Sequence, residues 1–276
     1  MPELAEVEFA RKHWDPGLGQ PVLAVQLHAE KRIFRGSDPK VIARILVRQY
    51  FLRSVARGKQ LLFVFSSKNR EVIGARARSL SWLGIHLGMS GSLRCERPDF
   101  VPGKHDHLVL RQKRQALVFR DPRQFGRVRF HWGKAAPEWW NTVVPEIVTP
   151  EFNLRFVERF LDRHGRAPIK AILLRQDGFP GIGNWMADEI LWRAMILPSR
   201  PARLLGKAAR IALLRQTKFV ARSSLKILGH DDSDLPRGWL IHQRWNRNGI
   251  CPRHRTPLRH ATIGGRTTAW CPRCQK

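Results

Sequence analysis

The sequence predicts an α+β protein in which an N-terminal helix and an antiparallel β-sandwich precede a helical region and a C-terminal metal-binding hairpin. Short apolar runs separated by turn residues fill the first half of the chain, which is typical of a sandwich. Apolar residues at helical spacing dominate much of the second half. Three of the four cysteines lie beyond residue 250, and the length of 276 residues suits two domains.

The first element is a helix from residue 4 to about residue 14. Leu4, Val7 and Trp14 recur at helical spacing, and Asp15-Pro16-Gly17 ends the helix. Strand-like runs follow at 22–27, 61–65, 83–87, 108–110, 117–120 and 127–130. Their short length and the turn residues between them predict antiparallel pairing.

The second half of the chain begins after a proline-containing segment without clear periodicity. We therefore expect a catalytic sandwich domain over 1–133, a linker over 134–151, a helical domain over 152–240 and a metal-binding hairpin over 241–276. The helices are expected at 154–163, 168–174, 184–195 and from about 207 to 228.

The chain is strongly basic, with 50 Lys and Arg against 22 Asp and Glu, a formal net charge of +28. Such a charge favours a nucleic-acid partner, because each neutralised phosphate releases condensed counterions. A ribosome-associated protein and a merely basic surface remain open at this point. No apolar run approaches the about 20 residues of a membrane span, and the N-terminus lacks a signal-peptide core. We therefore expect a cytoplasmic protein.

The C-terminal cysteines form a metal-ligand pattern. Cys251 and His254 are separated by two residues, as are Cys271 and Cys274. Each short spacing lets two ligands on one turn face the same tetrahedral ion, and four protein ligands leave no open position. The pattern predicts one structural Zn²⁺, with a hairpin through Gly264-Gly265 between the two ligand pairs.

Residue 2 is a proline, so removal of Met1 would expose a secondary amine. An α-amine has a pKa near about 8, so part of it is neutral and nucleophilic near neutral pH. Glu3 beside it is a candidate general acid. From these residues alone, an ordinary helix start with acids near the positive dipole end is the favoured interpretation.

Several ordered stretches extend these local patterns over the whole chain: PELAEVE (2–8), GK (58–59), HLGMSGSLR (86–94), KHDH (104–107), DPRQFG (121–126), GIGN (181–184) and CPRCQK (271–276). Together they resemble the formamidopyrimidine-DNA glycosylase and endonuclease VIII family. The resemblance implies a helix–two-turn–helix DNA-binding domain and a zinc finger. It also implies a repair enzyme that flips a damaged base out of double-stranded DNA, excises it and nicks the strand as an AP lyase. Such an enzyme is expected to act as a nucleoid-associated monomer of bacterial type.

The resemblance also implies residue roles. Pro2 is the expected Schiff-base nucleophile, Glu3 the acid, Lys59 the base of the first elimination and Arg266 the residue of the second. The expected DNA-binding residues are Met89, His105, Arg123, Phe125, Lys170 and Asn184, of which Met89, Arg123 and Phe125 fill the hole left by the flipped base. Asn184 is also expected to cap a helix whose free N–H groups attract phosphate.

Some positions depart from the family pattern. Ala5 replaces a proline, Gln124 an arginine and His254 a cysteine, and residues 66–82 form a longer basic insertion. Residues 222–249 do not match the glycine- and threonine-rich loop that closes over an oxidised purine. The resemblance implies formamidopyrimidine and 8-oxoguanine as the substrates. Because this loop differs, oxidised pyrimidines, as for endonuclease VIII, are the alternative. A non-catalytic zinc-dependent DNA-binding protein and an RNA-binding zinc-ribbon protein are the alternatives from other classes.

Overall fold

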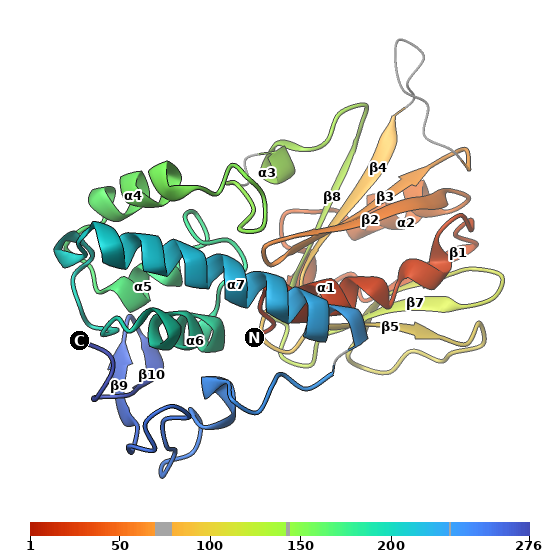
Figure 1. Cartoon of the computed structure of the whole chain (residues 1–276). Coiled ribbons are helices and arrows are strands. Elements are labelled where there is room, and N and C mark those ends of the chain that lie inside the picture. The colour runs from red at the N-terminus through yellow and green to blue at the C-terminus, as the bar shows by residue number, and fades with distance from the viewer. Residues whose placement is uncertain (70–78, 142–143, 232) are drawn as a thin grey trace. The chain divides into compact units, whose positions relative to one another are not determined.

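The computed structural model describes residues 1–69, 79–141, 144–231 and 233–276, so much of the expected 66–82 insertion lies outside the described residues. The described residues form two compact units. The first comprises residues 1–2 and 6–141, and the second comprises residues 3–5 and 144–276. Figure 1 shows the elements of both units along the chain.

The first unit contains two four-stranded antiparallel sheets. One has the order β1-β6-β7-β5 and the other the order β2-β3-β4-β8. The strands are β1 (Ala24–Leu27), β2 (Tyr50–Arg57), β3 (Gln60–Ser66), β4 (Leu80–His86), β5 (Ser92–Glu96), β6 (Asp106–Arg111), β7 (Ala116–Arg120) and β8 (Arg127–Gly133). The expected sandwich is confirmed, although β2 and β5 were not predicted.

The two sheets share one apolar core. Leu61 and Phe63 of β3 and Phe119 of β7 belong to it and are fully buried. Successive strand residues face opposite sides of a sheet, and Leu62 contributes to a second, smaller cluster on the outer face of the same sheet. Because β3 is covered on both sides, its sequence is continuously apolar and does not show the alternation of an exposed strand.

Short helices flank the sheets. They are α1 (Leu4–Lys12), η1 (Asp15–Gly17), η2 (Arg32–Phe34), α2 (Pro39–Leu46) and α3 (Glu138–Asn141). The predicted first helix is confirmed and is followed by the 3-10 turn at the predicted stop. The unpredicted α2 is capped by the preceding Asp38, whose carboxylate accepts the amide N–H of Lys40 at 2.8 Å. The segment 134–151, which was expected to be a linker, contains the short helix α3.

The second unit is mainly helical. Its helices are α4 (Leu154–Arg163), α5 (Ile169–Leu173), α6 (Asn184–Ala194), η3 (Ala202–Leu204), α7 (Lys207–Asp231) and η4 (Leu240–His242). The four predicted helices are confirmed, and α7 extends further than expected. Buried residues of α6 such as Met186 and Ile190 pack with Leu213 and Val220 of α7 in one core. α6 is buried almost all round, which explains its weak amphipathic pattern.

A two-stranded hairpin follows. β9 (Arg259–Ile263) pairs antiparallel with β10 (Arg266–Trp270). Gly264 and Gly265 form the turn with φ of +61° and +72°, a left-handed conformation that favours glycine. The predicted hairpin is therefore confirmed.

Candidate active site

The carboxylate of Glu3 is held by the beginning of α6. Its Oε2 accepts the amide N–H groups of Gly183 at 2.9 Å and Met186 at 3.1 Å, and its Oε1 accepts that of Trp185 at 3.0 Å. The first N–H groups of a helix have no partner within the helix and attract negative charge. Glu3 is only 3% exposed, so these bonds fix its carboxylate in one place.

Gly183, the residue before α6, lies against Glu3. A Cβ on Gly183 would lie 2.3 Å from the Cδ of Glu3, so only glycine fits. Asn184 does not cap the helix, because its Nδ2 donates to the carbonyl of Thr267 at 2.9 Å. The expectations of an Asn184 cap and of free helix amides for phosphate are therefore wrong, since Glu3 occupies these amides.

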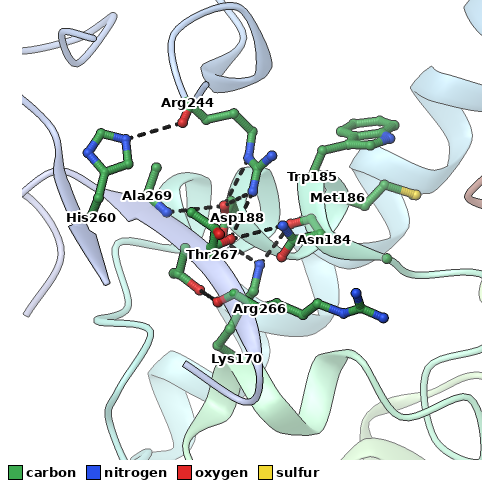
Figure 2. A network of polar contacts seen from close by, with 12 residues as sticks. Lys170, Asn184, Trp185, Met186, Asp188, Arg244, His260, Arg266, Thr267 and Ala269 are labelled. Carbon is green, nitrogen blue, oxygen red and sulfur yellow. Dashed lines mark hydrogen bonds and ion pairs between the residues drawn. The ribbon is translucent and has the colours of Figure 1, made fainter. Parts of the chain in front are cut away.

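A buried network centred on Asp188 of α6 joins α5, α6 and the hairpin (Figure 2). Its Oδ1 accepts Nζ of Lys170 at 2.5 Å, and its Oδ2 accepts Nη2 of Arg244 at 2.6 Å and the amide of Ala269 at 3.2 Å. Lys170 and Asp188 are fully buried and Arg244 is 2% exposed. Burial lowers the pKa of Lys170, and the charge of Asp188 opposes this shift. The expected direct contact of Lys170 with DNA conflicts with its burial.

Arg266 begins β10 and is exposed. In Figure 2 its guanidinium extends away from the Asp188 network. The turn of the hairpin rests on α5, because a Cβ on Gly264 would lie 2.8 Å from the Cβ of Ala171. The carbonyl of Thr267 accepts Nη2 of Arg244 at 3.2 Å. Arg266 thus projects from a hairpin that is anchored at its turn and along β10.

In the first unit, Lys59 lies in the tight turn between β2 and β3. Gly58 precedes it with a φ of +57°, as in the two-residue turns that join antiparallel strands. Lys59 is 9% exposed, and its Nζ lies 3.9 Å from the Sδ of Met1. The structure therefore brings Lys59 together with the start of the chain, where Pro2 follows Met1.

Asp121 organises two loops that carry expected DNA-binding residues. Its Oδ1 accepts the hydroxyl of Ser90 at 2.7 Å and its Oδ2 the amide of Gly126 at 2.7 Å. Ser90 follows Met89, and Gly126 follows Phe125. Asp121 is fully buried, whereas Met89 and Phe125 are 37% and 46% exposed. A buried carboxylate thus holds two exposed apolar side chains on adjoining loops.

The same aspartate connects His105 and Arg123 to these loops. The amide of Asp121 donates to the carbonyl of His105 at 3.0 Å, and the amide of Arg123 donates to Oδ1 of Asp121 at 3.3 Å. The guanidinium carbon of Arg123 lies 4.8 Å from the ring centroid of Phe125. All four expected DNA-contact residues of this unit are therefore arranged around Asp121.

The predicted metal ligands form one cluster. Ligand atoms of Cys251, His254, Cys271 and Cys274 all lie within 4.8 Å of one another. His254 Nδ1 is 3.6 Å from Cys251 Sγ and 3.9 Å from Cys271 Sγ. Zinc bonds of about 2.3 Å to sulfur and about 2.0 Å to nitrogen place tetrahedral ligand atoms about 3.5–3.8 Å apart. The cluster can therefore hold a metal ion of this kind.

The surroundings of Cys251 favour a thiolate. Burial opposes its ionisation, but hydrogen bonds from Trp192 and His254 lower the pKa of the thiol to about 7. Nε1 of Trp192 donates to Cys251 Sγ at 3.3 Å. Thiolates are the form in which cysteines bind metals, and such outer hydrogen bonds orient the ligands.

Sequence reasoning assigned no role to Asp121, Asp188 or Arg244. Asp121 stands in the DPRQFG stretch, and a carboxylate before a proline turn is a common partner for loop N–H groups. Asp188 and Glu189 stand together on α6 between the apolar residues Ala187 and Ile190, which is a signal for buried charges with partners. Arg244 carried no comparable signal, because it is one of 50 cations.

Comparison with known proteins confirms the resemblance. Residues 1–128 match the family described as formamidopyrimidine-DNA glycosylase N-terminal domain, and residues 143–233 match the formamidopyrimidine-DNA glycosylase H2TH domain. The chain is 33% identical to a formamidopyrimidine-DNA glycosylase of Nitrosococcus oceani and 34% identical to one of Bordetella petrii, over the full length of all three chains.

Solved structures agree. MutM in complex with DNA containing carbocyclic 8-oxo-G has a TM-score of 0.83 and 25% identity, with full coverage of both chains. Lactococcus lactis Fpg (MutM) with DNA containing an oxidised pyrimidine has a TM-score of 0.84 and 24% identity, again with full coverage, and it supports the fold alone. Among the described residues, no helix is both long and apolar enough to cross a membrane.

Proposed function

The chain belongs to the formamidopyrimidine-DNA glycosylase family, and we propose on this basis that it excises oxidised or ring-opened purines from duplex DNA and then cuts the abasic strand as an AP lyase. The observation that carries the proposal is the anchoring of Glu3 by three amides of the first turn of α6, one residue after Pro2. A non-catalytic DNA-binding protein has no need of a buried carboxylate beside an N-terminal proline.

The proposed chemistry begins at Pro2. After removal of Met1, the neutral secondary amine attacks C1′ of the damaged nucleotide and the glycosidic bond breaks. Glu3 takes up the proton that the Pro2 amine gives up and donates it to the ring oxygen of the sugar, and the base leaves with the bonding electrons and takes a proton from solvent. The result is an iminium between Pro2 and the opened deoxyribose. Fixing Glu3 on α6 keeps the acid next to the nucleophile, which lowers the entropic part of the barrier.

Strand cutting follows from the iminium. Loss of a C2′ proton expels the 3′ phosphate, and we assign Lys59 to this first elimination. We assign Arg266 to the phosphate of the second elimination, since an exposed guanidinium on an anchored hairpin can donate two parallel hydrogen bonds to one phosphate.

The remaining residues of the proposed interface position the DNA. Met89, Arg123 and Phe125 would fill the space of the extruded base, because apolar and stacking side chains offset the cost of unstacking. His105 would contact the backbone. Asn184 and Lys170 would act through the hairpin, because both are engaged within the second unit. We propose that the protein acts as a monomer in a bacterial cytoplasm.

The metal cluster would hold one structural Zn²⁺ with Cys251, His254, Cys271 and Cys274 as ligands. Four protein ligands complete a tetrahedral shell, so the ion would supply folding energy to the hairpin and take no part in the chemistry.

Borohydride trapping tests the proposal. The protein freed of Met1 is incubated with a duplex containing 8-oxoguanine and with one containing an abasic site, and cyanoborohydride reduces any iminium. We expect a covalent adduct with both duplexes, which acetylation of the Pro2 nitrogen abolishes because an amide nitrogen is not nucleophilic. Arg114→Gln, in an exposed turn between β6 and β7, is the control for general loss of positive charge. Absence of an adduct from the unmodified enzyme with both duplexes would refute the catalytic assignment.

A preference for oxidised pyrimidines is the second candidate, and the segment after α7 favours it. Leu235 and Trp239 are 4% exposed, and the Trp239 ring lies 4.7 Å from the guanidinium carbon of Arg193. Nε2 of His242 lies 2.8 Å from the carbonyl oxygen of Leu235. A segment pinned in this way is less free to fold over a purine. Excision rates for 8-oxoguanine, formamidopyrimidine and oxidised pyrimidine duplexes distinguish the two candidates.

A further inference from the structure

Three arginines of the first unit converge on one cavity of about 250 Å³. Arg127 and Arg129 lie two residues apart on β8 and therefore share a face of the sheet, while Val128 between them is buried in the core. On the neighbouring strand β4, Arg127 pairs with His86 and Arg129 pairs with Gly84. The pairing register thus places two guanidinium groups on the outer face at the end of the sheet.

Arg35 reaches the same cavity from outside the sheet. The segment after η2 runs along the free edge of β8, where the amide of Phe130 donates to the hydroxyl of Ser37 at 3.2 Å. Nη1 of Arg35 donates to the carbonyl of Gly126 at 2.9 Å, which holds the guanidinium beside Arg127. The third cation is therefore placed by backbone contacts and not by chance exposure.

The cluster has no counter-charge in the described part of the chain. None of Arg35, Arg127 and Arg129 forms an ion pair there, and Nε of Arg127 is buried without a hydrogen-bond partner. Burial and the charge of Arg127 both lower the pKa of Arg35 and of Arg129. Like charges held together without an acid are unfavourable unless a bound anion compensates them.

His86 supplies a further donor. Its Nδ1 accepts the amide of Gly88 at 3.0 Å, so Nε2 carries the proton in the neutral ring. Burial lowers the pKa of His86, and the charges of Lys59, Arg129 and Arg35 lower it further, which favours this neutral form. The cavity wall therefore offers three guanidinium groups and one imidazole, and no acidic side chain of the described residues lines it.

From this arrangement we propose that Arg35, Arg127 and Arg129 form a phosphate-binding pocket. Guanidinium forks match phosphate oxygens in two-pronged hydrogen bonds, and three of them suit a group with several equivalent oxygens. Phe125, which lines the same cavity, is one of the residues proposed to touch the DNA. The inference rests on the proposed function in naming a backbone phosphate of the bound duplex as one source; a free phosphate-bearing ligand is the other.

The test compares the wild type with the Arg127→Gln/Arg129→Gln double variant and with Arg114→Gln. One arm titrates inorganic phosphate at constant ionic strength and follows arginine Nε–H resonances. The other measures affinity for an undamaged duplex at several salt concentrations. We expect the double variant to bind inorganic phosphate at least about tenfold more weakly than Arg114→Gln does, because bidentate contacts to phosphate are lost.

The duplex arm identifies the source. Loss of one backbone contact lowers the slope of log K against log salt by about 0.9, so a smaller slope for the double variant than for Arg114→Gln assigns the pocket to the duplex. An unchanged slope with weakened binding of inorganic phosphate assigns it to a free ligand. If neither arm separates the double variant from Arg114→Gln, the pocket inference is wrong.

Two controls keep this outcome apart from others. The melting temperature reports folding, and we expect the double variant to melt no lower than the wild type because repulsion between the arginines is relieved. Arg35→Gln removes the third guanidinium at an exposed residue and is the second variant, for use if the double variant does not fold. Excision of 8-oxoguanine by the wild type is measured in the same preparations. Its absence would overturn the proposed function and leave the phosphate measurement valid, whereas normal excision with indistinguishable variants would overturn the pocket alone.

Discussion

Glu3 and Gly183 are in direct contact although 180 residues separate them in the chain. The amide of Gly183 donates to Oε2 of Glu3 at 2.9 Å, and a Cβ at position 183 would lie 2.3 Å from the Cδ of the same side chain. The residue after the proposed nucleophile is therefore seated on the first turn of α6, and a methyl group at 183 is enough to disturb it.

Gly183→Ala is expected to slow base excision by about tenfold to a hundredfold, because a displacement of about 1 Å at a catalytic group can cost that much. Single-turnover excision of 8-oxoguanine measures the effect. Gly238→Ala is the matched control in the same unit, since a Cβ there meets none of the described residues within 4 Å. Equal rates for the two variants would mean that the seat of Glu3 has no catalytic importance.

Asp121→Asn is expected to weaken binding to damaged duplex more than binding to undamaged duplex. The carboxylate accepts Ser90 Oγ and the amide of Gly126, and an amide in its place cannot accept at both oxygens. A buried donor left without a partner costs about 1–3 kcal/mol. The loops that carry Met89 and Phe125 should loosen, which 2-aminopurine fluorescence beside the lesion would detect as reduced extrusion.

Asp99→Asn controls for the loss of one negative charge in the same unit, because Asp99 is exposed and, among the described residues, pairs only weakly with Arg97 at 3.8 Å. We expect its damaged-duplex affinity to equal that of the wild type. A similar loss in both variants would point to net charge instead of loop positioning.

The elements that the sequence predicted are those with a local signal. Apolar spacing located α4 and α6, and two spaced ligand pairs located the metal cluster around Cys251. The missed strand β2 has partly exposed residues on both faces, so its sequence shows no clear alternation. Local sequence patterns are therefore sufficient to predict an element whose residues act through their spacing along the chain.

The site depended on contacts that no local pattern encodes. The carboxylate of Glu3, and not the side chain of Asn184, accepts the first amides of α6. The ammonium of Lys170 is buried against Asp188 and does not reach the surface. Both contacts join residues remote in sequence, and the ordered motifs gave the residue types without their partners. The clustering of the two arginines of β8 beside His86 likewise became evident only from the pairing register of β8 with β4.

Removal of the metal is expected to unfold the hairpin and weaken DNA binding while the first unit stays folded. Structural zinc sites supply the folding energy of small hairpins, so chelation or Cys274→Ala should produce an early melting step. His254→Cys should retain one zinc per chain by elemental analysis, and His254→Ala should lose it. A full zinc content in Cys274→Ala would contradict the four-ligand assignment.

Asp188→Asn is expected to destabilise the second unit by about 3–5 kcal/mol, because it leaves the buried charges of Lys170 and Arg244 without a counter-charge. Asp162→Asn is the control, since this exposed carboxylate pairs with Arg210 at the surface and should cost about 0–1 kcal/mol. Denaturant unfolding measures both. Released from Asp188, the hairpin should also position Arg266 less well, which lowers the second elimination product relative to the first.

The cost of Asp188→Asn should shrink as the pH rises. Burial lowers the pKa of Lys170 and Asp188 raises it, so removing Asp188 lowers the pKa further. A base with a folded-state pKa below its unfolded value binds fewer protons when folded, so stability rises with pH up to the unfolded pKa of about 10.4. Unfolding at pH 7 and pH 9.5 should therefore show Asp188→Asn regaining stability relative to the wild type. The double variant Lys170→Met/Asp188→Asn, which has no amine to titrate there, should lack this gain; its persistence would place the titrating group elsewhere.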